Sequence, residues 1–264
     1  MIFRMPDAAS PHSPPRRPHA AAWAALLSQA AVAVAWWQLG WQVGLPLLLA
    51  SHAVFLWGTL RPQSALFGPV VTRLPTDAPV AWLTIDDGPS DDTPAILELL
   101  QAYGAKATFF VVAERARARP ALVRDIVRRG HSLGNHSASH PSAWFWALGP
   151  RRMAAEIEQA QATLHDVAGV APRWFRAVVG MANPFVAAPL RRLGLARVAW
   201  SARGFDAVSA DPSAVVARID RDLAPGAIVL MHEGAAHGRS VEAIALLLER
   251  MKQRGLRCVL PEDL

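Results

Sequence analysis

The 264-residue sequence predicts an α/β protein in which a parallel sheet follows a pair of membrane-associated helices. Three observations lead to this expectation. Short β-branched or aromatic runs alternate with longer amphipathic segments after residue 78, which is typical of a parallel sheet, either doubly wound or closed into a β/α barrel. Polar residues follow several of the predicted strands. An uncharged apolar region, residues 20–60, precedes all of them.

Composition excludes several classes of function. The net charge is +6, but the part of the chain after residue 60 holds 24 basic and 20 acidic residues, and the arginines are scattered. Without a clustered basic face or a nucleic-acid-binding motif, we expect no nucleic-acid partner. Cys258 is the only cysteine, so an intramolecular disulfide and a cysteine-based metal cluster are excluded. A hydrophobic fraction of 52% is ample for a core.

The first sixty residues divide into a tail and an apolar region. Residues 1–19 are rich in Pro, Ser and Arg and are predicted to be a disordered tail. Residues 20–60 contain no charged side chain and form two runs separated near Gly40, each long enough for a helix to cross a hydrocarbon layer of roughly 30 Å. We therefore predict a helical membrane hairpin. The alternatives are one anchor followed by a segment lying in the interface, or a cleaved signal peptide.

Flanking arginines predict the orientation of this hairpin. Arg16 and Arg17 precede the first run, whereas Arg61 and Arg73 follow the second, and the link between the runs is uncharged. Positively charged flanks stay on the cytoplasmic side of a membrane. The expected location is the inner (cytoplasmic) membrane, with the rest of the chain on its cytoplasmic face.

A proline-dotted linker, residues 61–77, leads into a predicted catalytic domain, residues 78–264. The expected strands are short, β-branched or aromatic runs at 80–85, 106–112, 174–178, 197–201, 227–231 and 256–260. The expected helices, several of which begin at proline and end before glycine, cover 94–102, 120–129, 151–167, 185–193, 212–223 and 241–254. No internal repeat is visible.

Polar residues stand where the reacting groups of parallel α/β folds are found, at the carboxyl ends of strands. Asp86 and Asp87 follow the first predicted strand and His232 follows the run 227–231, while Arg176 and Asp206 lie within or beyond other strands. A chance distribution over the surface would not prefer strand ends. The sequence therefore predicts a polar site at this edge of the sheet.

Two further aspartates follow closely in the stretch LTIDDGPSDDTP. Asp91 and Asp92 precede a predicted helix that Thr93 can cap and Pro94 can start. Negative charge is favourable at the positive end of a helix dipole. This second pair is therefore expected to be structural.

A histidine pair lies in the stretch GHSLGNHSASHP. His136 and His140 are four residues apart, a spacing that on a helical turn lets both imidazoles reach one metal ion. Alone, this pattern indicates a metal site only weakly. His131 falls outside the ligand spacing and is expected to be structural.

Taken together, these motifs resemble those of polysaccharide deacetylases, carbohydrate esterase family 4, with its chitooligosaccharide deacetylase homology domain. The resemblance covers residues 78–260 and rests on motifs in the family's order: TIDDGP, KATFFV, GNHSASH, WFRAVVG and VLMHEG. It implies a distorted β/α barrel of the seven-stranded type. It also implies that Asp87, His136 and His140 hold a divalent metal ion, expected to be zinc.

The same resemblance implies roles for four catalytic residues. Asp86 would be the general base, and Arg176 would hold it in place and stabilise its charge. His232 would protonate the departing amine, and Asp206 would orient His232. A backbone N–H near Val179 would contribute to oxyanion stabilisation.

Two motifs depart from the family pattern. The third motif usually reads Arg-Pro-Pro-Tyr/Phe-Gly, whereas residues 176–180 read Arg-Ala-Val-Val-Gly. The fourth usually ends in Asp-Trp, whereas Ala207 follows Asp206 here. All the polar roles remain filled, but the aromatic wall of the sugar groove is altered, so we expect a different substrate fit.

The predicted function is that of a metal-dependent hydrolase that removes an N-acyl group, expected to be acetyl, from an amino sugar of a poly- or oligosaccharide near a membrane. Its partners would be this acylated substrate and, through residues 20–60, the membrane. One alternative keeps the site but places a lipid-linked sugar or a non-sugar amide in it at the cytoplasmic face. Another is an inactive membrane-anchored binding protein whose polar residues are idle.

Overall fold

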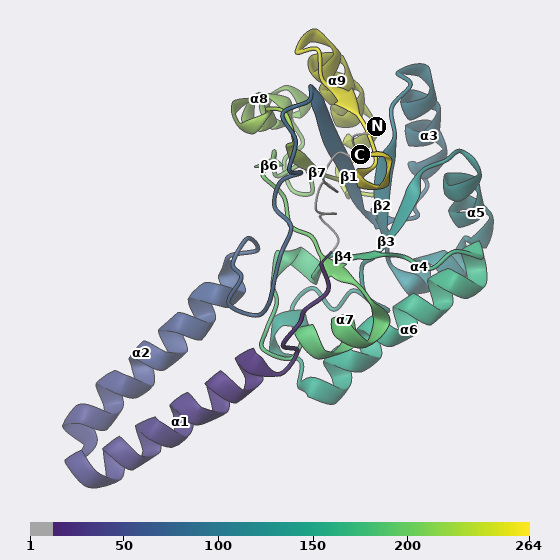
Figure 1. Ribbon diagram of the computed structural model, residues 1–264. Helices are drawn as coiled ribbons and strands as arrows, with labels where there is room; N and C mark the ends of the chain where they lie inside the picture. The colour runs from purple at the N-terminus through teal and green to yellow at the C-terminus, as the bar shows by residue number, and fades with distance from the viewer. Residues whose placement is uncertain (1–12) are drawn as a thin grey trace, which may run out of the picture.

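The computed structural model describes residues 13–264, so residues 1–12 of the predicted disordered tail lie outside the described residues. Residues 16–19 form a bend and a turn that lead into the first helix, and Pro15 before them is buried. The two expected N-terminal helices are present as α1 (Ala20–Leu39) and α2 (Trp41–Leu60). They form the predicted hairpin, which projects away from the rest of the molecule (Figure 1).

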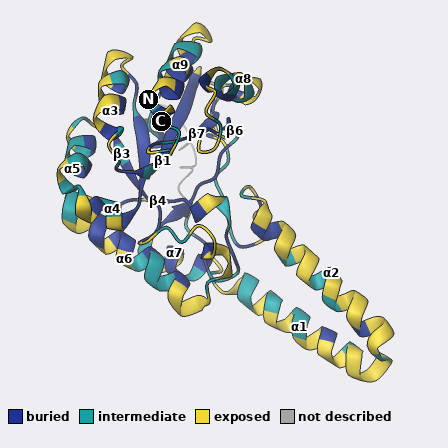
Figure 2. Cartoon of the chain, turned by 180° about the vertical axis from the view of Figure 1, so that it is seen from behind, coloured by how far each residue is buried: buried dark blue, intermediate teal, exposed yellow. Residues whose placement is uncertain are grey.

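Small residues allow this hairpin to close. Gly40 joins the two helices with φ 80°, a conformation that favours glycine. A Cβ at Gly44 would lie 2.5 Å from the ring of Trp36, so only glycine lets the helices approach there. Gln29 Nε2 donates a hydrogen bond to Ser51 Oγ across the pair at 3.1 Å. Most of the remaining side chains are apolar and exposed (Figure 2), and both helices are long and apolar enough to cross a membrane.

The part of the chain that follows the hairpin is built on one curled parallel sheet. Within residues 13–264 it has eight strands: β1 (Val80–Gly88), β2 (Ala107–Val111), β3 (Ser132–Asn135), β4 (Trp174–Phe175), β5 (Ala196–Arg197), β6 (Ala202–Arg203), β7 (Ile228–His232) and β8 (Arg257–Cys258). Seven follow the order β5-β4-β3-β2-β1-β7-β6, and β8 pairs with β1. Because β5 and β6 end this order without pairing, the sheet is a half-barrel, which confirms the predicted seven-stranded distorted barrel.

Helices surround this sheet: α3 (Thr93–Ala102), α4 (Ala113–Ala118), α5 (Pro120–Arg128), α6 (Pro150–Ala168), α7 (Ala187–Leu193), α8 (Pro212–Asp222) and α9 (Ser240–Gln253). The sequence did not predict β3, α4 or β6. In β3, the glycine at position 134 weakens the sequence pattern that predicts a strand. Glycine is nevertheless required at this position, because a Cβ would lie 2.4 Å from the Phe110 ring. The predicted strand 197–201 is wrong in extent, since the chain leaves the sheet after Arg197 and returns at Ala202.

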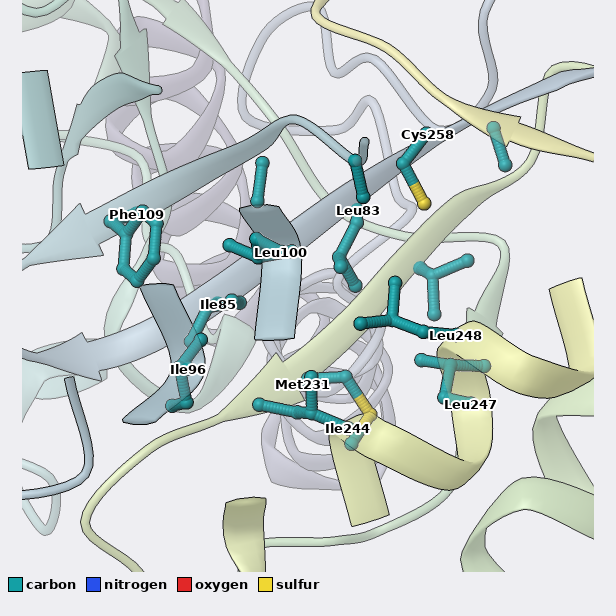
Figure 3. Packing of buried hydrophobic residues seen from close by; sticks show 14 of the residues in the cluster. Leu83, Ile85, Ile96, Leu100, Phe109, Met231, Ile244, Leu247, Leu248 and Cys258 are labelled. Carbon is teal, nitrogen blue, oxygen red and sulfur yellow. The ribbon is translucent and has the colours of Figure 1, made fainter. Parts of the chain in front are cut away.

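The main core lies between the sheet and its covering helices. Leu83 and Ile85 of β1 pack with Ile96 of α3 and with Ile244 and Leu247 of α9 (Figure 3). Full burial of each such side chain contributes about 1.5–3 kcal/mol. Because side chains alternate along a strand, the residues that alternate with Leu83 and Ile85, namely Thr84 and Asp86, face the concave side of the sheet. The core packing therefore fixes which carboxylate points toward the site.

The base of the hairpin packs directly on the part of the molecule that contains the sheet. The rings of Phe55 in α2 and Phe67 are stacked with centroids 6.4 Å apart, and Phe67 belongs to a buried cluster that also contains Phe175. The predicted linker, residues 61–77, is a packed segment: Arg197 Nη2 donates to the carbonyls of Ser64 at 2.7 Å and Gly68 at 3.0 Å. The hairpin and the sheet are thus connected through a rigid contact.

Candidate active site

The predicted site residues meet at one cleft of about 200 Å³ on the concave side of the sheet. Its lining comes from the ends of β1 and β7 and from the loops after β3, β4 and β6: Asp86, Asp87, His136, His140, Val179, Gly180, Trp200, Arg203, Phe205, Ala207, Val208, Leu230 and His232. Two predicted catalytic residues, Arg176 and Asp206, are buried behind this lining. All seven predicted site residues therefore belong to one locus.

The candidate metal ligands are Asp87, His136 and His140. The Nε2 atoms of His140 and His136 lie 2.9 Å and 3.6 Å from Asp87 Oδ1, and all three ligand atoms lie within 4.8 Å of one another. Asp87 Oδ1 is buried and has no hydrogen-bond partner of suitable geometry. One carboxylate oxygen and two imidazole nitrogens so close together fit a divalent ion with open positions, as in catalytic zinc sites.

A break in strand regularity brings both aspartates to the cleft. Successive side chains of a regular strand point to opposite faces. The register with β2 shifts between Asp86 and Gly88, and Asp87 has φ 72°, in the left-handed region that non-glycine residues rarely adopt. Arg115 Nη1 donates to the Asp87 carbonyl and holds this turn. Burial would raise the pKa of Asp87, but His140 and His136 outweigh it and lower the pKa.

The histidine pair lies in a loop after β3, so the expected helical turn is wrong. Ser137 and His140 have φ values of 72° and 54°, which no helix contains. Glu156 of α6 organises this loop: its carboxylate accepts hydrogen bonds from the backbone N–H groups of Ala138 and Ser139 at 3.0 Å and from Ser139 Oγ at 2.7 Å. Sequence reasoning missed Glu156 because its partners lie on another element.

The ring of His136 is oriented by the backbone of β4. His136 Nδ1 donates to the Arg176 carbonyl at 2.9 Å, since a carbonyl oxygen can only accept. The Nε2 atom, which faces Asp87, is then the unprotonated nitrogen of the neutral ring. Burial is the main cause that lowers the pKa of His136. The imidazole is therefore held in the tautomer and charge state of a metal ligand.

Arg176 and Asp86 form a fully buried ion pair. Arg176 Nη1 donates to Asp86 Oδ1 at 2.7 Å and to Thr84 Oγ1 at 2.8 Å, and Nη2 donates to the Ala199 carbonyl at 3.0 Å. The guanidinium also lies 4.2 Å from the centroid of the Phe110 ring. Asp86 Oδ2 lies 3.7 Å from His136 Nε2, on the side of the candidate metal ligands. Arg176 thus fixes the carboxylate with its second oxygen toward the cleft.

His232 and Asp206 form a second pair across the cleft. Asp206 Oδ2 accepts the backbone N–H of His232 at 2.6 Å, and Asp206 Oδ1 accepts His232 Nδ1 at 3.0 Å. Burial would lower the pKa of His232, but the hydrogen bond and negative charge of Asp206, with the charges of Asp86 and Asp87, raise it to about 9. His237 Nε2 donates to the Asp206 carbonyl at 2.7 Å and steadies this loop.

Other polar residues that the sequence analysis singled out serve the scaffold. Thr93 does not cap α3 as expected; its hydroxyl accepts from the N–H of Ser90 at 2.8 Å and donates to Glu233. Asp92 accepts from the N–H of Gly234 at 2.9 Å. His131 accepts from the backbone N–H of Ala107 at 3.3 Å, and burial lowers its pKa to about 4. The contacts of Thr93 and Asp92 join the loops that carry the site, whereas His131 lies at the opposite end of the sheet, where β2 and β3 begin.

Comparison with known proteins decides the family. The sequence model of the polysaccharide deacetylase family matches residues 73–198. A chitooligosaccharide deacetylase of Sinorhizobium fredii is 31% identical over 198 residues, covering 70% of this chain and 91% of the relative. The chain belongs to the polysaccharide deacetylase family. Another relative, a peptidoglycan-N-acetylglucosamine deacetylase of Bacillus cereus, is 29% identical over 215 residues, covering 78% and 97% of the two chains.

Solved structures of the family have the same fold. The family 4 carbohydrate esterase from Streptomyces lividans, determined in complex with acetate, is 31% identical and has a TM-score of 0.64, covering 71% of this chain and 96% of that chain. This polysaccharide deacetylase is therefore a hydrolase of carbon–nitrogen bonds other than peptide bonds. The matched regions leave the hairpin outside the family model.

Sequence reasoning missed part of the cleft wall. Trp200, Arg203, Phe205 and Val208 line the cleft, and they come from the segment WSARGFDAV that carries Asp206. The only signal was the mixture of aromatic and basic residues in a stretch predicted as strand and loop. Their convergence depends on how β6 pairs with β7, which the sequence alone did not indicate.

Proposed function

We propose that this protein is a metal-dependent deacetylase that removes the N-acetyl group from an amino sugar of a poly- or oligosaccharide next to a membrane. The observation that carries the proposal is the convergence, in one cleft, of a metal-ligand set with a carboxylate base and a histidine acid. Relatives named as chitooligosaccharide and peptidoglycan deacetylases support acetylated sugars as the substrate class.

In this proposal, Asp87, His136 and His140 hold the divalent ion, and zinc matches their mixture of oxygen and nitrogen donors. When bound, the ion would supply Lewis-acid polarisation of the amide carbonyl and an acidified water. The orphaned, buried Asp87 Oδ1 gains a partner on binding, which offsets the cost of burying that oxygen.

Asp86 is the proposed general base. Arg176 occupies its Oδ1, so Oδ2 is the atom that can accept a proton on the cleft side. Because Arg176 is itself held by Thr84 and Ala199, the carboxylate cannot rotate freely. Such fixed orientation is what efficient proton transfer requires.

His232 is the proposed general acid. Its raised pKa keeps the imidazole protonated at neutral pH, and Asp206 on Nδ1 leaves Nε2–H to donate to the departing amine. The backbone at Val179, whose φ is 48°, lies on the cleft wall where an N–H could meet a developing oxyanion.

The hairpin supports a location at a membrane. Two 20-residue apolar helices each span about 30 Å, the thickness of a hydrocarbon core. Arg16 and Arg17 before α1 and Arg61 after α2 favour the cytoplasmic face of the inner membrane for the catalytic domain.

The experiment measures acetate released from penta-N-acetylchitopentaose by the full-length protein in detergent, together with its zinc content. We expect Asp86→Asn to retain zinc but to lose at least 10²-fold in kcat, because the base is gone. His136→Ala should lose zinc and activity together. Asp91→Asn is the matched control, since this exposed carboxylate only pairs with Arg119 at the surface. Full turnover by Asp86→Asn, or a wild-type protein that binds no divalent metal, would contradict the proposal.

A further inference from the structure

Arg203 occupies a special place in the catalytic cleft. It ends the short strand β6 and its side chain is part of the cleft lining. The guanidinium carbon lies 3.9 Å from the centroid of the Phe205 ring and 5.1 Å from that of Trp200. Two aromatic faces therefore hold the guanidinium in position, as cation–π contacts do.

This guanidinium has no counterion. Among residues 13–264, Arg203 makes no hydrogen bond and no ion pair within 4.0 Å, and its Nε atom is buried without a partner. The other two buried arginines differ, since Arg176 contacts Asp86 and Arg197 contacts two carbonyls. Burial lowers the pKa of Arg203, with partial opposition from the charge of Asp206. An unpaired, half-buried charge is costly unless a ligand compensates for it.

The neighbouring acidic groups are already engaged. Asp86 pairs with Arg176, with 2.7 Å between Oδ1 and Nη1, and Asp206 pairs with His232, with 3.0 Å between Oδ1 and Nδ1. The part of the cleft next to Arg203 is otherwise apolar, because Val179, Phe205 and Val208 form an exposed rim there. A negatively charged group that entered this apolar surrounding would meet the Arg203 guanidinium, which, unlike the His232 imidazolium, has no carboxylate partner among residues 13–264.

We propose that Arg203 binds a negatively charged oxygen group of the substrate, so that this cleft takes an acylated amino sugar carrying a carboxylate or a phosphate in preference to a neutral one. The planar fork of a guanidinium matches both oxyanions, through two parallel N–H···O bonds. The inference rests on the proposed deacetylase function and adds the charge of its substrate.

Matched sugars distinguish the two sources of negative charge. The neutral probe is methyl N-acetylglucosaminide, the phosphate probe is N-acetylglucosamine 1-phosphate, and the carboxylate probe is N-acetylmuramic acid. Full-length, zinc-loaded protein in detergent is assayed for acetate release from each. We expect kcat/KM for one of the anionic probes to exceed that for the neutral probe by about 10- to 100-fold, the range of one charge-assisted hydrogen-bonded pair. The better anionic probe identifies the source.

Arg203→Met removes the charge and keeps an apolar stem between the rings. It should remove the preference by lowering kcat/KM for the anionic probe about 10- to 100-fold, and it should lower kcat/KM for the neutral probe by a clearly smaller factor. Arg203→Lys should restore part of the preference, because lysine keeps the charge without the fork. Arg239→Met is the control, since Arg239 is an exposed arginine that pairs with Glu242. An equal preference in wild type and Arg203→Met, or an equal loss on all probes, would overturn the inference.

A binding measurement separates this inference from the proposed function. Calorimetric titration of the same probes into Asp86→Asn and into the double variant Asp86→Asn/Arg203→Met reports affinity without turnover. If an anionic probe binds more tightly than the neutral probe, and if this difference is lost in the double variant, the anion site is supported. This conclusion holds even if the wild-type protein releases no acetate, a result that would contradict the deacetylase proposal alone. Binding that ignores both charge and Arg203 refutes the anion site while leaving the deacetylase proposal standing.

Discussion

At the scale of single residues, the pairing of Asp206 with His232 makes the site sensitive to pH. Burial of the imidazole disfavours its charged form, and the carboxylate reverses this effect. Because the pKa of His232 in the folded protein is about 9, the proposed general acid is protonated below pH 9 and loses its proton as the pH rises through this value. The alkaline limit of activity should therefore report His232.

Replacing Asp206 by Asn should shift that limit downward. Without the carboxylate, burial dominates and lowers the pKa of His232, so the alkaline limb of the kcat profile moves toward neutral pH. At pH 7 we expect kcat to fall by about 10²- to 10⁴-fold, the usual contribution of a general acid. A pH profile of acetate release from pH 5.5 to 10 measures the shift, with Asp91→Asn as control. An unchanged alkaline limb would show that His232 is not the titrating acid.

At the scale of elements, the site depends on how loops are tied to neighbouring helices. The loop after β3 has two residues at positive φ and carries both metal-binding histidines, yet it forms no regular structure. Glu156 of α6 replaces the missing backbone partners with three hydrogen bonds to this loop. Helix α6 is thus a positioning element for the candidate metal ligands.

Glu156→Gln should weaken metal binding without touching a ligand. The amide can accept with only one oxygen and presents an N–H₂ group to backbone donors, so the loop loses part of its support. We expect zinc affinity to fall about 10-fold or more, as for other residues that orient metal ligands. Competition with a chromophoric chelator measures this affinity. Glu158→Gln is the matched control, because Glu158 on the same helix pairs with Arg192 at the surface; an equal effect of both changes would rule out the positioning role.

At the scale of the whole molecule, the hairpin brings the catalytic cleft close to its own base. Pro62, two residues after α2, packs against Gly180 and Trp200, which both line the cleft. The approach is so close that a Cβ at Gly180 would come within 2.6 Å of Pro62 Cγ and 2.5 Å of the Trp200 ring. Gln63 Nε2 donates to the Trp200 carbonyl at 3.2 Å. A membrane around the hairpin would therefore set the distance and direction from which substrate reaches the cleft.

A charge in the middle of α1 should release the protein from membranes. Leu27 is 65% exposed on the hairpin, and an arginine at the centre of a membrane helix costs about 2.5–3.5 kcal/mol. After carbonate washing, we expect most wild-type protein to remain in the membrane fraction and a clearly smaller share of Leu27→Arg. Leu246→Arg, on the 40% exposed surface of α9, is the control. Wild-type protein found in the soluble fraction would contradict the membrane location.

Much of the fold followed from local sequence patterns. Hydrophobic runs and proline–glycine boundaries located most strands and helices, because these signals act between residues close in the chain. Strand β3 was missed because Gly134 is selected by contact with Phe110 of another strand. Helix α4 was missed because AERARA is short and its apolar residues are alanines. The strand predicted at 197–201 failed because β5 and β6 join opposite ends of the sheet.

Motifs and hydropathy, which are properties of the chain, were enough to predict the residue types of the site, their order and the apolar hairpin. Which carboxylates face the cleft depended instead on tertiary contacts, because the shifted register at Asp87 arises from pairing between β1 and β2. Tertiary contacts likewise determine that Glu156 supports the histidine loop and that Arg203 stands unpaired beside two aromatic rings. These features arise from contacts between residues that are far apart in sequence. Such contacts form, and contribute to stability, only when the sheet has brought the residues together.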